Sequence, residues 1–219
     1  PSQPNKIKLC ALPHKLIITN QEVALTEDQV KEHFNSVNTL SSDIVKNPDN
    51  AMLYYARAID FYLVQDFDNA LNDLNACIER NPEFFPAYFT RALIHYKELE
   101  FKKREKNFEL ISTDSKSVQV NTLDYARIRD DLDKVIEIAP NFVYAYYNRA
   151  NILTLMKNYR GAIIDYDKVL ELDPNMSDAY FNRGLTHIFL GNNRLGIQDL
   201  SKAGELGIFS AYNIIKRFT

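Results

Sequence analysis

Residues 143–176 read VYAYYNRANILTLMKNYRGAIIDYDKVLELDPNM, and this stretch decides the fold. Tyr146, Ala150 and Leu153 are spaced four and three residues apart, which places them on one face of a helix. A second set of residues keeps helical spacing further along: Tyr159, Ala162, Tyr166, Val169 and Leu170. Asp173-Pro174 then ends the second helix, because proline cannot continue one. The stretch therefore predicts an antiparallel pair of helices.

The markers of this stretch recur along the chain at a fixed interval. Four prolines stand 34, 58 and 34 residues apart: Pro48, Pro82, Pro140 and Pro174. Tyrosines and arginines keep the same steps: Tyr54, Tyr88, Tyr146, Tyr180, Arg57, Arg91, Arg149 and Arg183. A period near 34 residues predicts a solenoid of helical hairpins. The 58-residue gap predicts one inserted segment, at about residues 99–123.

Composition excludes several classes of protein. The 219 residues are 46% hydrophobic, enough for a sizeable core, and carry a formal net charge of −3. This charge favours neither nucleic acid nor an anionic membrane surface, and no apolar run reaches the length of about 18 residues that a membrane span needs. Cys10 and Cys77 are expected to be reduced thiols, with Cys77 in the core. The chain begins at Pro1 without an initiator Met, so we expect a processed product or a piece, and the compartment stays open.

The pattern divides the chain into seven expected segments. They are an extended N-terminal arm (1–24), a half-repeat or cap helix (25–48), four repeats (49–82, 83–142, 143–176 and 177–207) and a C-terminal capping helix (208–219). The arm, from Ile7 to Ala24, is rich in β-branched residues and predicts an extended segment or a small hairpin. Thr26 is a suitable N-cap for the helix that follows. In the inserted repeat we expect an overlong first helix and then a polar loop, Ser112–Asn121.

Four copies of this pattern resemble tetratricopeptide repeats. The first-helix motif stands at residues 54–58, 146–150 and 180–184, and the second-helix motif in Phe67 with Ala70 and Tyr159 with Ala162. The resemblance covers about residues 49–207, and the ending KAGELG at 202–207 is similar to bacterial members. Two positions depart from the pattern: Ile128 replaces a small alanine, and Asn193 replaces an aromatic residue.

The resemblance implies an all-α, right-handed α-solenoid whose concave groove is lined by the first helix of each repeat. The lining residues would be Met52, Tyr55, Ile59, Tyr62, Phe89, Leu93, Tyr96, Tyr147, Asn151, Thr154, Phe181, Leu185 and Ile188. Such an aromatic and apolar surface suits protein binding, although some of these residues are also expected to pack helices together. Tyr55 and Ile59 occupy slots where some members carry a clamp for a C-terminal carboxylate, so that function is not expected.

The predicted function is a non-catalytic scaffold that binds an extended apolar peptide or partner segment in the groove. The nearest candidate occupant is the chain's own arm, Ile7–Ile18, in cis or from a second copy. The alternative is a structural self-assembly module in which the arm or the groove joins copies into a homo-oligomer. No nucleic acid, membrane span, metal or cofactor is expected.

The residues that catalysis would need are scattered. The four histidines lie far apart in sequence, and His95 and His187 are expected to be packed at an aromatic slot of their helices. No HExxH, CxxC or glycine-rich phosphate loop occurs. Asp130-Asp131 is expected to be a solvated pair on a helix surface, and the four recurrent arginines are expected to bond carboxylates between repeats. The sequence therefore predicts that the chain is not an enzyme.

Overall fold

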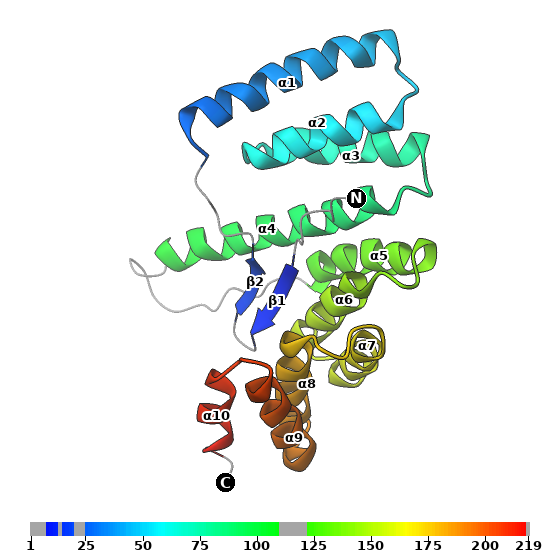
Figure 1. Ribbon diagram of the computed structural model, residues 1–219. Helices are drawn as coiled ribbons and strands as arrows, with labels where there is room; N and C mark the ends of the chain where they lie inside the picture. The colour runs from blue at the N-terminus through cyan, green and yellow to red at the C-terminus, as the bar shows by residue number, and fades with distance from the viewer. Residues whose placement is uncertain (1–7, 13–14, 20–24, 110–121, 218–219) are drawn as a thin grey trace. The chain divides into compact units, whose positions relative to one another are not determined.

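The computed structural model describes residues 8–12, 15–19, 25–109 and 122–217. They form two compact units, Glu22–Ala139 and Pro1–Gln21 with Pro140–Thr219, each described here by itself. The first unit holds α1 (Glu27–Lys46), α2 (Ala51–Leu63), α3 (Phe67–Arg80), α4 (Phe85–Glu109) and α5 (Thr122–Ile138) (Figure 1). The second holds β1 (Lys8–Leu12), β2 (Lys15–Thr19), α6 (Val143–Leu155), α7 (Tyr159–Leu172), α8 (Ser177–Phe189), α9 (Asn193–Glu205) and α10 (Ser210–Ile215).

Successive helices pack in antiparallel pairs, as the repeat predicts. Helix α2 packs on α3 and α4 on α5 in the first unit, and α6 packs on α7 and α8 on α9 in the second. Each pair corresponds to one period of the sequence. The all-α architecture of helix-turn-helix repeats is therefore confirmed.

Small residues let the two helices of a pair approach closely. Ala58 of α2 and Ala70 of α3 are fully buried. The same slots of the last pair hold Gly184 and Gly196, where a Cβ added to Gly184 would lie 2.9 Å from the Gly196 carbonyl oxygen. The two backbones of α8 and α9 are thus too close for a side chain at this crossing.

The turn inside three of the pairs, α2–α3, α6–α7 and α8–α9, uses a left-handed residue at the same slot. Gln65, Lys157 and Gly191 have φ of 65°, 60° and 80° respectively. This conformation suits glycine and is uncommon for other residues, so the turn imposes it on Gln65 and Lys157. Side chains cap the next helix after two of these turns: Asp66 accepts from the backbone N–H of Asn69, and Asn158 from that of Gly161.

The inserted repeat and the first helix follow the sequence pattern. Helix α4 is 25 residues long, whereas α2, α6 and α8 have 13 each. The expected loop Ser112–Asn121 lies outside the described residues. Thr26 caps α1 with a reciprocal capping box to Gln29, which confirms the predicted N-cap.

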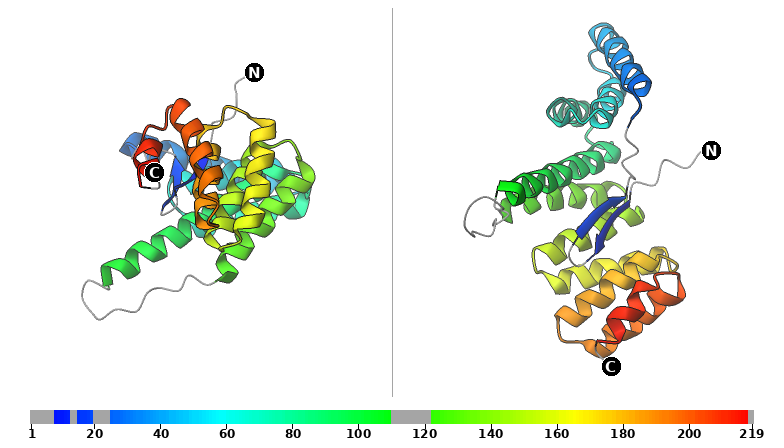
Figure 2. Two further views of the ribbon diagram at one scale, coloured as in Figure 1. Left: turned by 90° about the horizontal axis from the view of Figure 1, so that it is seen from below. Right: turned by 90° about the vertical axis from the view of Figure 1, so that its left-hand side faces the viewer.

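The arm contains a β-hairpin. Strand β1 pairs antiparallel with β2, from Lys8 opposite Thr19 to Leu12 opposite Lys15. Within its unit, β1 lies against α6 and α8, as the right-hand view of Figure 2 shows for α6. An extended strand thus lies against the first helices of two successive repeats in this unit.

Helix α10 packs on α9 at the end of the second unit. Ala211 is fully buried there, and the Tyr212 ring lies so close to α9 that a Cβ on Gly204 would be 2.5 Å from it. Tyr212 nevertheless keeps 41% of its surface exposed.

Candidate functional site

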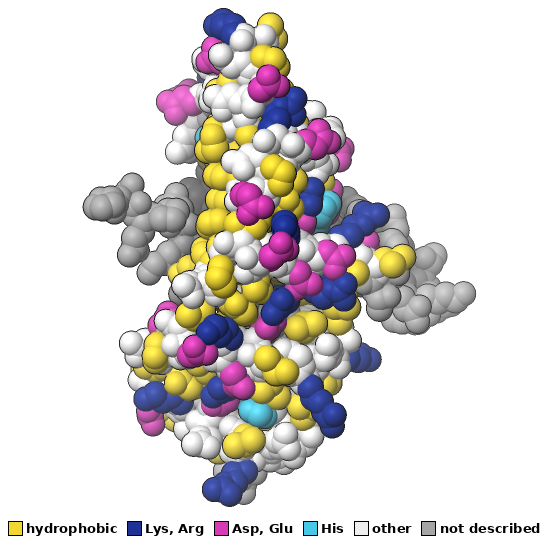
Figure 3. Space-filling view, turned by 90° about the vertical axis from the view of Figure 1, so that its right-hand side faces the viewer, with side chains coloured by type: hydrophobic (Ala, Val, Ile, Leu, Met, Phe, Trp, Pro, Cys, Tyr) yellow, Lys and Arg dark blue, Asp and Glu magenta, His cyan; other side chains and the backbone are white. Residues whose placement is uncertain are grey.

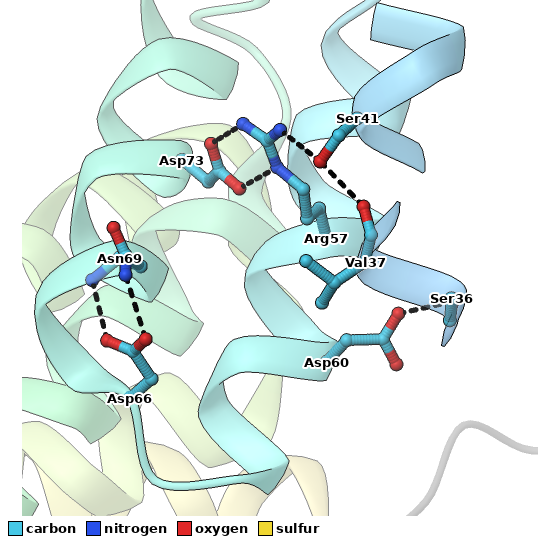
Figure 4. Close-up of polar contacts among 8 residues, drawn as sticks. All are labelled: Ser36, Val37, Ser41, Arg57, Asp60, Asp66, Asn69 and Asp73. Atoms are coloured by element: carbon cyan, nitrogen blue, oxygen red, sulfur yellow. Dashed lines mark hydrogen bonds and ion pairs between the residues drawn. The ribbon is translucent and has the colours of Figure 1, made fainter. Parts of the chain in front are cut away.

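A bidentate arginine–aspartate bond closes each helix pair. Arg57 of α2 donates from Nε and Nη2 to the carboxylate of Asp73 on α3, both at 2.7 Å (Figure 4). The equivalent pairs are Arg91–Asp131, Arg149–Asp165 and Arg183–Asp199. The four aspartates are buried. Because a buried charge is stable only when paired, these bonds are structural rather than a ligand site.

The remaining guanidinium nitrogen reaches the preceding helix. Arg57 Nη1 donates to Ser41 Oγ at 2.9 Å, Arg91 Nη1 to Asn75 Oδ1 at 2.6 Å and Arg183 Nη1 to Asp167 Oδ1 at 2.6 Å. The prediction of carboxylate bonds between repeats therefore holds for Arg183 with Asp167. The bidentate bond itself lies within a repeat, because the two helices of a pair are each other's nearest neighbours. Hydrogen bonds to Asp199 are the main cause that raises the pKa of Arg183.

Asp131 corrects one expectation from the sequence. Asp130 is exposed, but Asp131 is only 6% exposed and is paired with Arg91. Adjacent residues on a helix point about 100° apart, so one carboxylate faces solvent and the next faces the pair. The two aspartates are therefore not a solvated pair.

Most of the predicted binding residues are buried. The buried residues are Tyr62, Phe89, Leu93, Tyr96, Tyr147, Asn151, Phe181 and Leu185. The half-buried ones are Tyr55, Ile59, Thr154 and Ile188, and Met52 is exposed at 48%. The expectation of a wide exposed apolar surface is thus wrong for eight of the thirteen, because the core and neighbouring segments cover them.

Helix α2 carries the most open of these residues. Tyr55 is half-buried: its ring is edge-on to that of Phe84, with 4.9 Å between the ring centroids, and its hydroxyl lies 3.4 Å from Thr90 Oγ1. Burial raises the pKa of Tyr55. Met52 and Leu63 stay exposed on the same helix, at 48% and 37%.

Helices α6, α7 and α8 share a buried hydrogen-bond network. Asn182 Nδ2 donates to Tyr147 Oη at 2.9 Å and to Asn151 Oδ1 at 3.3 Å. The Tyr166 hydroxyl donates to the same Asn151 oxygen at 2.6 Å, and burial raises the pKa of Tyr166. The network joins two predicted binding residues, Tyr147 and Asn151, to two that sequence reasoning missed.

Asn148, the residue after Tyr147, is also buried but forms no hydrogen bond with this network. It is fully buried, and neither of its amide atoms has a hydrogen-bond partner within the part of the chain that the structure describes. Asn148 and Asn182 occupy the same slot of successive repeats. That recurrence was the sequence signal that could have pointed to a polar interior here.

The histidines are held in separate environments. His33 Nδ1 lies 2.8 Å from Asp60 Oδ1, and His95 Nδ1 lies 3.2 Å from Glu98 Oε2. His187 is half-buried, and desolvation is the main cause that lowers its pKa. Among the described residues, no group of three or more His, Cys, Asp or Glu side chains is placed to hold a metal ion.

Among the described residues, neither the helices nor the face drawn in Figure 3 shows a feature typical of a membrane span or a nucleic-acid site. Within residues 25–109 and 122–217, no helix combines the length and apolar character that crossing a membrane requires. On the face drawn in Figure 3, acidic and basic side chains are interspersed among hydrophobic ones rather than gathered by sign. The surface of that face therefore gives no single-sign patch for a polyanion.

Residues 143–176 match the tetratricopeptide repeat family profile, over the stretch that folds as α6 and α7. This match identifies one tetratricopeptide repeat in the chain, at residues 143–176. The crystal structure of MamA is similar at a TM-score of 0.66 and 15% identity, covering 87% of this chain and 99% of that one. MamA 41-end from Desulfovibrio magneticus RS-1 gives 0.62 and 15%, covering 83% and 97%. The likeness extends the fold beyond residues 143–176.

A third similar structure is that of a domain with a bound peptide. The first tetratricopeptide repeat domain of Spaghetti (RPAP3), bound to the HSP90 peptide SRMEEVD, gives a TM-score of 0.51 at 16% identity, covering 64% of this chain and 93% of that one. No curated protein sequence matches the chain. At these identities the solved structures show the fold alone.

Proposed function

We propose that this repeat protein is a non-catalytic protein-interaction scaffold whose first helices bind an extended apolar peptide or partner segment. The observation that carries the proposal is the contact of an extended strand, β1, with the first helices α6 and α8. An extended backbone fits against these helices, and many proteins recognise partners as extended segments. The bound peptide of the RPAP3 domain supports the same use of the fold.

The side chains at the predicted binding positions of α2 favour an apolar peptide. Tyr55 and Ile59 stand where a carboxylate clamp would need polar side chains, and Met52 and Leu63 extend the apolar character along α2. Exposed apolar side chains gathered on one helix gain free energy when a partner covers them. We therefore expect an apolar segment rather than the acidic end of SRMEEVD.

A peptide-binding assay with matched variants tests this function. Immobilised apolar and acidic 12-residue peptides are probed with the wild-type chain, Met52→Asp and Val45→Asp. Val45 is a control because it is 81% exposed but lies on α1. We expect apolar peptides to bind and Met52→Asp to weaken them about ten-fold, which corresponds to about 1.4 kcal/mol. Equal binding by the two variants, or no apolar binding, would contradict the proposal.

The self-assembly alternative has a separate readout. Light scattering over a concentration series measures the molar mass of the chain in solution. A monomer at all concentrations supports the scaffold. A mass that rises with concentration, and that falls when peptide is added, favours a module whose own segments join copies.

A further inference from the structure

We propose that the N-terminal hairpin is an intramolecular ligand of the α6–α8 face, the surface of α6 and α8 that β1 contacts. In this arrangement the hairpin competes in cis with any external segment for that face. The inference rests on the proposed function, because it names what occupies one binding surface when no partner is present.

The first support is the position of the hairpin. Residues 8–12 and 15–19 belong to the same compact unit as α6 to α10, although the whole of the first unit separates them in sequence. Strand β1 contacts both α6 and α8, the first helices of two successive repeats. A segment so placed lies across the helices that the repeat pattern assigns to binding.

The second support is the state of the predicted binding residues on those helices. Tyr147 and Asn151 of α6 are fully buried, and Phe181 and Leu185 of α8 are 3% and 7% exposed. At the corresponding slots of α2, Tyr55 and Ile59 remain half-buried. Thr154 of α6 and Ile188 of α8 stay half-buried, so the α6–α8 face is closed at the first four slots and not along its whole length.

The third support is the register of the hairpin. Leu9 is opposite Ile18 and Ala11 is opposite Leu16, and directly opposed residues share a face of a sheet. This places four apolar residues on one face. The other face carries Lys8, Cys10, Leu12, Lys15, Ile17 and Thr19, which include both lysines. A hairpin with one wholly apolar face gains free energy when a protein surface covers that face.

The occupant is the chain's own hairpin rather than a second copy. The strand and the helices it contacts lie in one unit of one chain. An intramolecular segment also has a high effective concentration, which gives it an advantage over a free segment of equal intrinsic affinity. A peptide must then bind to the small fraction of molecules in which the hairpin has left, and its apparent affinity falls by that fraction.

The test uses the full chain and a variant that disrupts one face of the hairpin. The variant is Leu9→Asp with Ile18→Asp, and the matched control is Cys10→Asp with Ile17→Asp on the opposite face. A labelled synthetic peptide of residues 7–20 is the probe, and fluorescence anisotropy measures its affinity. We expect the Leu9/Ile18 variant to bind the peptide at least about ten-fold more tightly than wild type or the control.

Hydrogen exchange supplies the second measurement. Amides of α6 and α8 should exchange faster in the Leu9/Ile18 variant than in wild type, and added peptide should restore protection. Unchanged exchange together with equal peptide affinity in all three proteins would overturn the proposal. A wild-type dimer in which both copies protect α6 and α8 would also overturn it, because the occupant would then come in trans.

The scaffold function and the intramolecular ligand can be disproved independently of each other. Loss of apolar-peptide binding in Met52→Asp tests α2 in the first unit, whereas the hairpin variants test the second unit. If the hairpin variants give no effect while Met52→Asp still weakens binding, the scaffold stands and the intramolecular ligand does not.

Discussion

Helices α2 and α6 are the same part of two repeats and present different surfaces. Each has 13 residues and a Tyr-Tyr pair at the same slots. Yet Tyr55 and Ile59 of α2 are half-buried and apolar, whereas Tyr147 and Asn151 of α6 are fully buried and hydrogen-bonded to other helices. The repeat thus sets the position of a slot, but the neighbours of the slot decide its exposure, since Tyr55 is half-buried and Tyr147 is fully buried at equivalent positions.

The largest expected effect comes from breaking the arginine–aspartate bond in each unit. Asp73→Ala leaves Arg57 with Ser41 as its remaining side-chain hydrogen-bond partner among the described residues, and should cost about 3 kcal/mol of unfolding free energy. Asp199→Ala should cost less, because Arg183 keeps Asp167 at 2.6 Å. Urea unfolding, monitored by hydrogen exchange of amides in each unit, measures the loss of unfolding free energy in both variants.

The exposed Glu79 on α3 provides the control for these two variants. Glu79→Ala should change the unfolding free energy by less than about 0.5 kcal/mol. Equal losses for Asp73→Ala and Asp199→Ala would show that Asp167 does not compensate Arg183.

The second prediction concerns the helix crossings. Gly184→Ala should destabilise the α8–α9 pair by about 2 kcal/mol, because the new Cβ would meet the Gly196 carbonyl oxygen at 2.9 Å and backbone cannot rotate away. The α2–α3 pair accommodates Ala58 and Ala70 at the same slots. Thermal unfolding tests this through the sign of the change in Tm. A steric clash lowers Tm, whereas helix propensity alone would make alanine stabilising by about 1 kcal/mol.

The third prediction separates the two asparagines at one slot. Asn182→Leu should cost about 1–2 kcal/mol, because it removes the donor to Tyr147 and Asn151. Asn148→Leu should be neutral or stabilising, because it removes an amide that is buried without a partner. Denaturant midpoints of the two variants give the comparison, and an equal loss in Asn148→Leu would mean that its amide is paired in solution.

The smallest expected effect is a pH dependence confined to α8. Burial lowers the pKa of His187 in the folded state, so the unfolded chain binds the proton more readily. Stability should therefore be complete above the unfolded pKa of about 6.5 and fall as the pH drops through it towards the folded pKa. His187→Leu, which copies Leu153 in the same slot of α6, should show a smaller loss of Tm between pH 7 and pH 5.5. An unchanged loss would assign the pH dependence to other groups.

The repeat was predictable from sequence because its markers are local. Proline, tyrosine and arginine at a fixed period locate the helix pairs, and Thr26 marks the start of α1. The extra length of α4 was also predictable, since polar helix-forming residues continue past the point where the first helix of the other repeats ends. These features depend on neighbours a few residues away.

The burial of the binding residues was not predictable in the same way. A slot facing the predicted groove is exposed only if no other segment covers it, and the contact of β1 with α6 and α8 joins distant parts of the chain. Asp131 shows the same limit, because its partner Arg91 lies 40 residues away instead of the usual 16. Where an insertion changes the spacing, the pair is found only in three dimensions.

That altered spacing has a practical consequence for engineering. The Arg91–Asp131 bond joins α4 to α5 as the other three pairs join theirs, although 24 additional residues stand between its partners. The bond therefore forms in spite of a longer stretch of chain between its partners, since loop closure costs only about 0.6 kcal/mol for each doubling of loop length. We expect a reporter inserted between α4 and α5 to leave this bond in place, because the bond already spans an insertion.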